Sequence, residues 1–157
     1  MEMRNEENLR AALREAARAH IRSRTVDDCF GVTLTLKQRS GVHLDDIRAA
    51  TSLRHLMNRL NTAVYGKRFS RFGTRLAVFP VLEKSSTGRL HYHLILQNPF
   101  PETPSRFEAL IAEQWAKTEF GYNEIHCDYH IDHGWSDYIT KFSTQQDQVD
   151  CANCHWS

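Results

Sequence analysis

The chain has 157 residues, 41% hydrophobic and 25% charged, which suits one domain with its own core and excludes a disordered, collagenous or coiled-coil protein. It has neither an apolar run near the roughly 18 residues of a membrane helix nor a secretory signal, so we expect one soluble cytoplasmic domain over residues 1–157. The net charge of +1 conceals a basic half, with 15 Lys/Arg against 8 Asp/Glu in residues 1–80, and an acidic half, with 5 against 11 in residues 81–157, so a polyanionic partner is expected.

The first half of the chain predicts a helix, a strand and a second helix. Residues 6–24 carry Ala and Leu at helical spacing, and residues 29–37 alternate apolar with small or polar residues as a strand does. Asp45 can cap a helix that runs to about residue 64, with an apolar stripe that begins at Ile47.

The second half predicts two strands, a helix, a strand and a last helix. The strands are residues 75–83, 89–97 and 123–131, and the helices are residues 105–119, capped by Ser105 and ended by Gly121, and residues 135–145. After the leading helix the order is therefore β-α-β-β-α-β-α, which predicts an α+β fold of ferredoxin-like or RRM-like type, an antiparallel sheet with helices on one face.

The four cysteines are expected to be reduced thiols, since the chain carries no export signal. Cys29 and Cys127 lie in apolar stretches and look like core residues. The Cys151-x-x-Cys154-His155 pattern formally matches a haem-attachment site. A flexible tail over residues 146–157 is the favoured interpretation of this end of the chain.

Two histidines and a carboxylate are predicted to meet on one hairpin. His91 and His93 are two residues apart in a strand and so project from the same face. A three-residue loop with Gly88 in the left-handed region would place Glu83 opposite His91. Two imidazoles and one carboxylate suit a divalent ion and leave positions open for substrate oxygens. The alternative is a hairpin with a solvated polar face.

Tyr138 and Lys141 are predicted to share one face of the last helix. A phenol has a pKa near 10 and is a poor nucleophile at neutral pH. A nearby cation and a metal-bound phosphate would both help it to react. Taken alone, the two residues are an ordinary amphipathic pair.

Basic and aromatic residues alternate between residues 59 and 75, as they do where basic groups follow phosphates and rings stack on unpaired bases. The alternative is a basic loop whose aromatic rings, among them Phe69 and Phe72, turn into the core. The predicted DNA-binding residues are Arg59, Tyr65, Lys67, Arg68, Arg71 and Arg75. A further polar cluster, His126, Asp128 and His130, is interpreted as a polar sheet face near the site.

In order and spacing, these motifs resemble those of HUH endonucleases, and in detail the single-tyrosine rolling-circle replication initiators of small phages, plasmids and single-stranded DNA viruses. The resemblance covers about residues 28–145. It implies that His91, His93 and Glu83 bind one Mg²⁺ or Mn²⁺ ion. It also implies that Tyr138 is the nucleophile and that Lys141 stabilises charge at the phosphate or the phenolate.

The resemblance implies a nickase that cuts single-stranded or hairpin DNA at a replication origin and joins the new 5′ phosphate to Tyr138. The last motif holds one tyrosine, so a two-tyrosine mechanism is not available from that helix. A separate helicase is expected, since no helicase segment follows residue 157. Two other functions stay open. One is a sequence-specific nucleic-acid-binding module without chemistry, and the other is a metal-dependent phosphoesterase using the histidines and Glu83.

Overall fold

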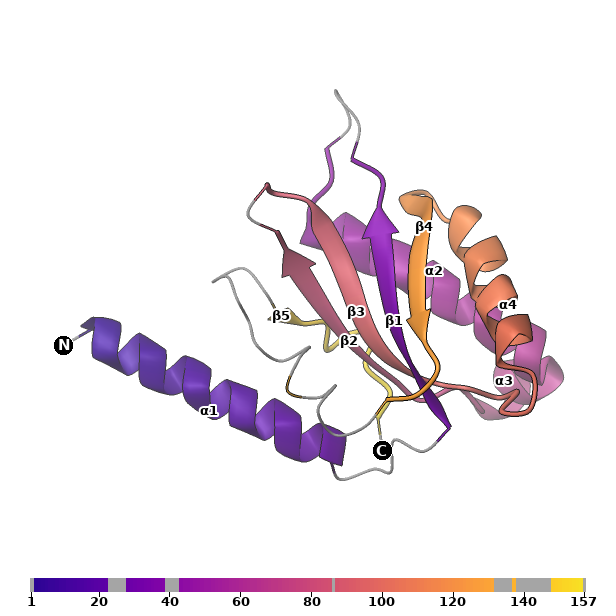
Figure 1. Ribbon diagram of the computed structural model, residues 1–157, viewed down its shortest axis with the longest axis horizontal. Coiled ribbons are helices and arrows are strands. Elements are labelled where there is room, and N and C mark those ends of the chain that lie inside the picture. Colours follow the sequence, from indigo (N-terminus) through magenta and orange to yellow (C-terminus); the bar gives the residue numbers. More distant parts are fainter. Residues whose placement is uncertain are drawn as a thin grey trace.

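The structure is a computed structural model that describes residues 2–22, 28–38, 43–85, 87–131, 137 and 148–156. Over these residues an antiparallel sheet has the strand order β4-β1-β3-β2-β5 (Figure 1), which confirms the predicted α+β fold. No helix among the described residues is long and apolar enough to cross a membrane. The strands are β1 (Cys29–Leu36), β2 (Val78–Lys84), β3 (Leu90–Gln97), β4 (Gly121–Asp128) and β5 (Gln148–Val149), and the helices are α1 (Glu2–Arg22), α2 (Asp46–Tyr65), α3 (Lys67–Phe72) and α4 (Pro104–Ala116).

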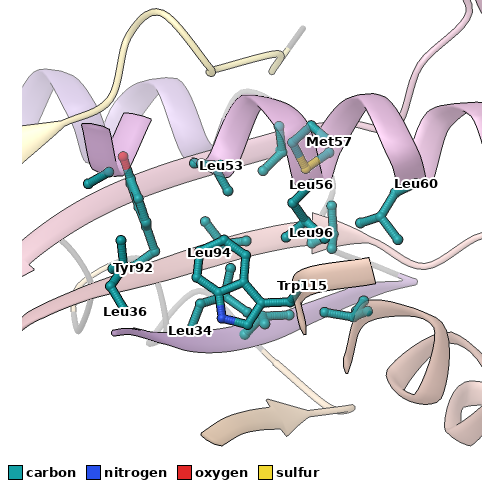
Figure 2. Packing of buried hydrophobic residues seen from close by; sticks show 14 of the residues in the cluster. Leu34, Leu36, Leu53, Leu56, Met57, Leu60, Tyr92, Leu94, Leu96 and Trp115 are labelled. Carbon is teal, nitrogen blue, oxygen red and sulfur yellow. The ribbon is translucent and has the colours of Figure 1, made fainter. Parts of the chain in front are cut away.

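The main core lies between the sheet and helices α2 and α4, which cover one of its faces (Figure 1). Alternate residues of β1 and β3, among them Leu34 and Leu94, point toward these helices because side chains alternate along a strand. Figure 2 shows Leu53 and Leu56 of α2 above these leucines, with Trp115 of α4 beside them. The other alternate residues of β1 and β3 are therefore left to the opposite face.

The opposite face of the sheet is apolar in one half and polar in the other. Helix α1 lies on this side (Figure 1), where Ile21 packs with Phe79, Ile95 and Trp156 in a second, smaller cluster. The half nearer the β2–β3 hairpin carries the histidines of β3 instead. One sheet thus offers a stable apolar support and a polar surface side by side.

The end of the chain differs from the flexible tail that the sequence predicts. Residues 148–156 lie along β2, where β5 pairs with Val81 and Leu82. The Trp156 side chain is 4% exposed, and its indole Nε1 donates a hydrogen bond to the Ile21 carbonyl at 3.1 Å. Burial of this large ring holds the segment in place, a long-range effect that local composition does not reveal.

A buried hydrogen bond joins the same segment to the centre of the sheet. The Tyr92 hydroxyl donates to the Asp150 carboxylate at 2.8 Å, and Asn153 donates to the same oxygen at 2.7 Å. Burial, together with the Asp150 charge, raises the pKa of Tyr92 well above its usual value of 10. Tyr92 therefore stays protonated and acts as a structural link beneath the two histidines.

The ends of the helices agree with the sequence in one case and correct it in another. Asp45 caps α2 as predicted, since its carboxylate accepts a hydrogen bond from the Arg48 backbone N–H at 2.8 Å, which lowers the pKa of Asp45. The predicted cap at Ser105 is wrong. Helix α4 begins at Pro104 with Thr103 as its N-cap, because proline at the first helical position already has the helical φ.

Gly121 does not merely follow the helix but begins β4. A Cβ atom at this position would lie 1.8 Å from the Trp115 carbonyl oxygen, so only glycine fits where β4 starts against the end of α4. This close approach brings β4 beside β1, and with it the last polar residues of the site.

Candidate active site

The β2–β3 hairpin has the predicted register. Glu83 lies opposite His91. The turn has Gly88 at φ 82°, in the left-handed region, and the Ser85 N–H donates to the Arg89 carbonyl at 2.8 Å. Glycine tolerates this backbone conformation at no steric cost, so the turn residues themselves fix which side chains face each other.

His93 is held from both sides of its ring. Its Nε2 atom lies 3.1 Å from a carboxylate oxygen of Glu83, its diagonal neighbour on β2. Its Nδ1 atom lies 3.2 Å from the hydroxyl of Thr33, which is directly opposite on β1. The His93 side chain is 8% exposed and that of Glu83 34%, so the pair sits at the boundary between the sheet and solvent. Contacts at both nitrogens fix the orientation of the ring and direct Nε2 at the carboxylate.

The donor set of this pair fits a hard divalent cation. Two neighbouring ligand atoms on an octahedral Mg²⁺ lie about 3 Å apart, given metal–ligand distances of about 2.1 Å. The separation of 3.1 Å between His93 Nε2 and Glu83 is of that size. His91 is half-buried on the same face, beside Glu83. Within the described part of the chain no three His, Cys, Asp or Glu side chains are close enough to form a complete metal-binding group, so the three-ligand set stays a prediction.

Strand β4 adds further polar side chains to this face. His126 is exposed and lies opposite Thr33, on the side of β1 away from His93. Asp128 lies on the same face, two residues further along, and accepts a hydrogen bond from the His130 backbone N–H at 3.2 Å. The cluster seen in the sequence is therefore next to the histidine pair, separated from it by one strand.

The two predicted catalytic residues, Tyr138 and Lys141, lie outside the described residues. Asp137 is described, and its carboxylate lies 3.2 Å from Arg18 Nε and 3.0 Å from a terminal nitrogen of Arg22. These two arginines belong to α1, which packs on the same side of the sheet as the histidines. The residue before Tyr138 is thus tied to an element on the histidine side.

Thr33 is the site residue that sequence reasoning missed. The alternation of Thr33 and Thr35 with leucine and valine marked a strand with a polar face, which was the available signal. It could not show that β1 pairs with β3, because these residues are 60 positions apart in the chain. The ion pairs of Asp137 with Arg18 and Arg22 left no signal of their own, since they join residues more than a hundred positions apart.

Comparison with known families now decides the class of protein. Residues 29–147 match the family model of the replication-associated protein ORF2, which covers β1 to β4 and the residues that follow. The chain belongs to this family. It is a family of rolling-circle replication initiators, so the protein is a Rep-like protein with DNA as its partner. None of the curated proteins or solved structures that were compared matches the chain.

In this Rep-like protein the predicted DNA-binding segment lies apart from the histidines. It occupies the end of α2 and all of α3, at the end of the sheet away from the β2–β3 hairpin (Figure 1). The Arg68 guanidinium lies 5.6 Å from the Tyr65 ring centroid, and that of Arg75 lies 5.5 Å from the Phe69 ring. Phe72 is 79% exposed, so it does not turn into the core. The structure therefore presents two separate polar surfaces, of which only one carries the histidines.

Proposed function

We propose that the protein is a metal-dependent, site-specific endonuclease and strand transferase acting on single-stranded DNA, and that it starts the rolling-circle replication of a phage or plasmid. One observation carries the proposal. The Thr33–His93–Glu83 contacts lie on the polar half of the sheet, in a chain of a replication-initiator family. A separate helicase would then unwind the duplex.

His91, His93 and Glu83 would hold one Mg²⁺ or Mn²⁺ ion, which when bound would polarise the scissile phosphate. Thr33 would keep the His93 ring turned so that Nε2 faces the ligand position, acting as a positioning residue. The carboxylate of Glu83 would lower the net charge of the site and favour a divalent cation over none.

Tyr138 would attack the phosphorus atom through its phenolic oxygen. A new Tyr138 O–P bond would form as the P–O3′ bond breaks, the phenolic proton would be lost, and the leaving strand would gain a 3′ hydroxyl. Since one phosphate ester replaces another, the bond is conserved for later rejoining by a 3′ hydroxyl. Lys141 would stabilise the negative charge that develops on the phenolate or the phosphate.

The function can be tested without knowing the origin sequence. A library of random single-stranded DNA is incubated with the protein and Mn²⁺, and the cut ends are sequenced. We expect cleavage at one short sequence, with none in EDTA. Binding of a distinct sequence without any cut would instead identify a non-catalytic binding module. Cuts at all sequences, with no protein attached to the DNA, would identify a phosphoesterase.

Thr33 provides a prediction for the positioning of His93. Thr33→Val keeps the shape of the side chain and removes the hydroxyl that contacts His93 Nδ1, so cleavage and Mn²⁺ affinity should fall by about 10- to 100-fold. Thr33→Ser keeps the hydroxyl and should retain most of both. Titration of each variant with Mn²⁺ measures the effect, and equal Mn²⁺ affinity in the two variants would exclude this role for Thr33.

The basic segment provides a second prediction. Replacing Lys67, Arg68 and Arg71 together with alanine removes three exposed cations and should weaken single-stranded DNA binding at low salt. The slope of log affinity against log salt should become shallower by up to about 2, since each lost phosphate contact accounts for about 0.7. Anisotropy measured over a salt series tests this. An unchanged slope would mean that the DNA does not follow α3.

A further inference from the structure

A cavity of about 430 Å³ opens beside the turn of the β2–β3 hairpin. Its volume falls in the range of about 300–1,000 Å³ that is usual for small-ligand sites. Three parts of the chain form it: the residues after β1, the hairpin and the start of β4. We call it the hairpin pocket, and its lining residues are Lys37, Gln38, Thr87, Arg89 and Tyr122.

The hairpin pocket belongs to the same face of the sheet as the histidines. Arg89 lies two residues before His91, and Tyr122 lies four residues before His126, so alternation puts each on the histidine side. Two residues of a strand span about 7 Å, so Arg89 lies roughly that far along β3 from His91. A strand of DNA that crosses the histidines would therefore reach the pocket without leaving this face.

One wall of the pocket is fixed by hydrogen bonds. The Gln38 side chain donates to the Gly88 carbonyl at 3.1 Å and accepts from the Leu90 N–H at 2.8 Å. These two bonds attach the end of β1 to the hairpin turn. The cavity is therefore already formed before a ligand enters, which lowers the entropic cost of binding.

The chemistry of the lining suits a nucleotide. The Tyr122 side chain is 38% exposed, and the Arg89 guanidinium lies 5.6 Å from the centroid of its ring. Arg89 is also 3.7 Å from the Glu124 carboxylate, a long ion pair in which both side chains are largely exposed and which would give way readily to a phosphate. Lys37 adds a second cation at the same opening. An exposed ring between two cations can stack a base while the cations bind the adjacent phosphates.

We propose that the hairpin pocket binds one unpaired nucleotide of the substrate strand, with its base on Tyr122 and its phosphate between Lys37 and Arg89. This inference rests on the proposed function, because it takes single-stranded DNA as the ligand. The pocket holds a nucleotide close to the cleaved phosphate and so sets the register of the strand over His91 and His93.

The experiment is an abasic scan of one oligonucleotide. A single-stranded DNA is selected for binding, not for cleavage, from a random library in EDTA. Each position in turn is then made abasic, and affinity is measured by anisotropy. With the unaltered protein, one position should cost about tenfold or more in affinity, the size of one stacked base. In Tyr122→Ala the same abasic position should cost nothing further, whereas Tyr122→Phe should behave as the unaltered protein.

A matched control removes a similar cation elsewhere. Arg106→Ala removes a guanidinium that lies 4.4 Å from the Phe100 ring centroid, outside the pocket, and should leave the position-specific loss intact. A selected strand whose abasic losses are the same in Tyr122→Ala and the unaltered protein would overturn the pocket while leaving the proposed function standing. Failure to select any binding strand would overturn both.

Discussion

Replacing His93 with alanine should reduce DNA cleavage by at least about a thousandfold, since a metal ion contributes several kcal/mol to charge stabilisation at the phosphate. The substitution removes Nε2, which lies 3.1 Å from Glu83, and the ring that contacts Thr33. The fold should survive, because His93 lies at the edge of the polar half of the sheet and not in the main core. His91→Ala and Glu83→Ala should have the same effect if all three residues bind the metal.

Two controls separate the metal site from general damage. His55→Ala changes an exposed histidine on α2, on the far side of the sheet, and should cleave normally. His126→Ala changes an exposed histidine on the same face and should retain most activity, unless His126 supplies the third ligand in place of Glu83. Cleavage rates with Mg²⁺, Mn²⁺ and EDTA, together with thermal melting, measure these effects. Undiminished cleavage in EDTA would contradict the metal assignment for every variant.

Tyr138→Phe should abolish the covalent protein–DNA species while DNA binding persists. The change removes one hydroxyl oxygen, which is the atom proposed to attack phosphorus, and leaves the ring in place. Lys141→Ala should slow formation of the species without abolishing it, since it stabilises charge but forms no bond. Denaturing gels of protein incubated with Mn²⁺ and the cleaved sequence measure the covalent band, and anisotropy measures binding.

Tyr129 supplies the matched control for this experiment. Its hydroxyl donates a short hydrogen bond to Glu108, and this bond raises the pKa of Tyr129 to about 12. Its ring stacks on Phe30 with the centroids 4.9 Å apart. A phenol held in this way is a weaker nucleophile than a free one, so Tyr129→Phe should still form the covalent species. A normal covalent band in Tyr138→Phe that is lost in Tyr129→Phe would reassign the nucleophile.

The hairpin that carries the histidines could be predicted from the sequence because its determinants are local. Gly88 selects the turn, the turn fixes the register, and the register places Glu83 beside His91. The same reasoning could not find Thr33, because the pairing of β1 with β3 depends on packing between distant segments. The metal-ligand pair was thus predictable, and the residue that orients it was not.

The C-terminal segment was missed for a related physical reason. Residues 148–156 contain little local signal for regular structure, and their order comes from one buried indole and one buried carboxylate, those of Trp156 and Asp150. The partners of these groups, Ile21 and Tyr92, lie far away in the chain. In the same way, alternating charge and aromatic character in residues 59–75 indicated a DNA-binding surface but gave no position relative to the sheet.

The most direct test of the account is to identify the atom that joins protein to DNA. The unaltered protein is incubated with Mn²⁺ and the cleaved sequence, denatured, digested with nuclease and trypsin, and analysed by mass spectrometry. The account predicts one modified peptide, with a nucleotide joined through its 5′ phosphate to Tyr138, and a second DNA product that ends in a 3′ hydroxyl. Cut DNA whose 5′ ends are all free phosphates, with no modified peptide, would contradict it and identify water as the nucleophile.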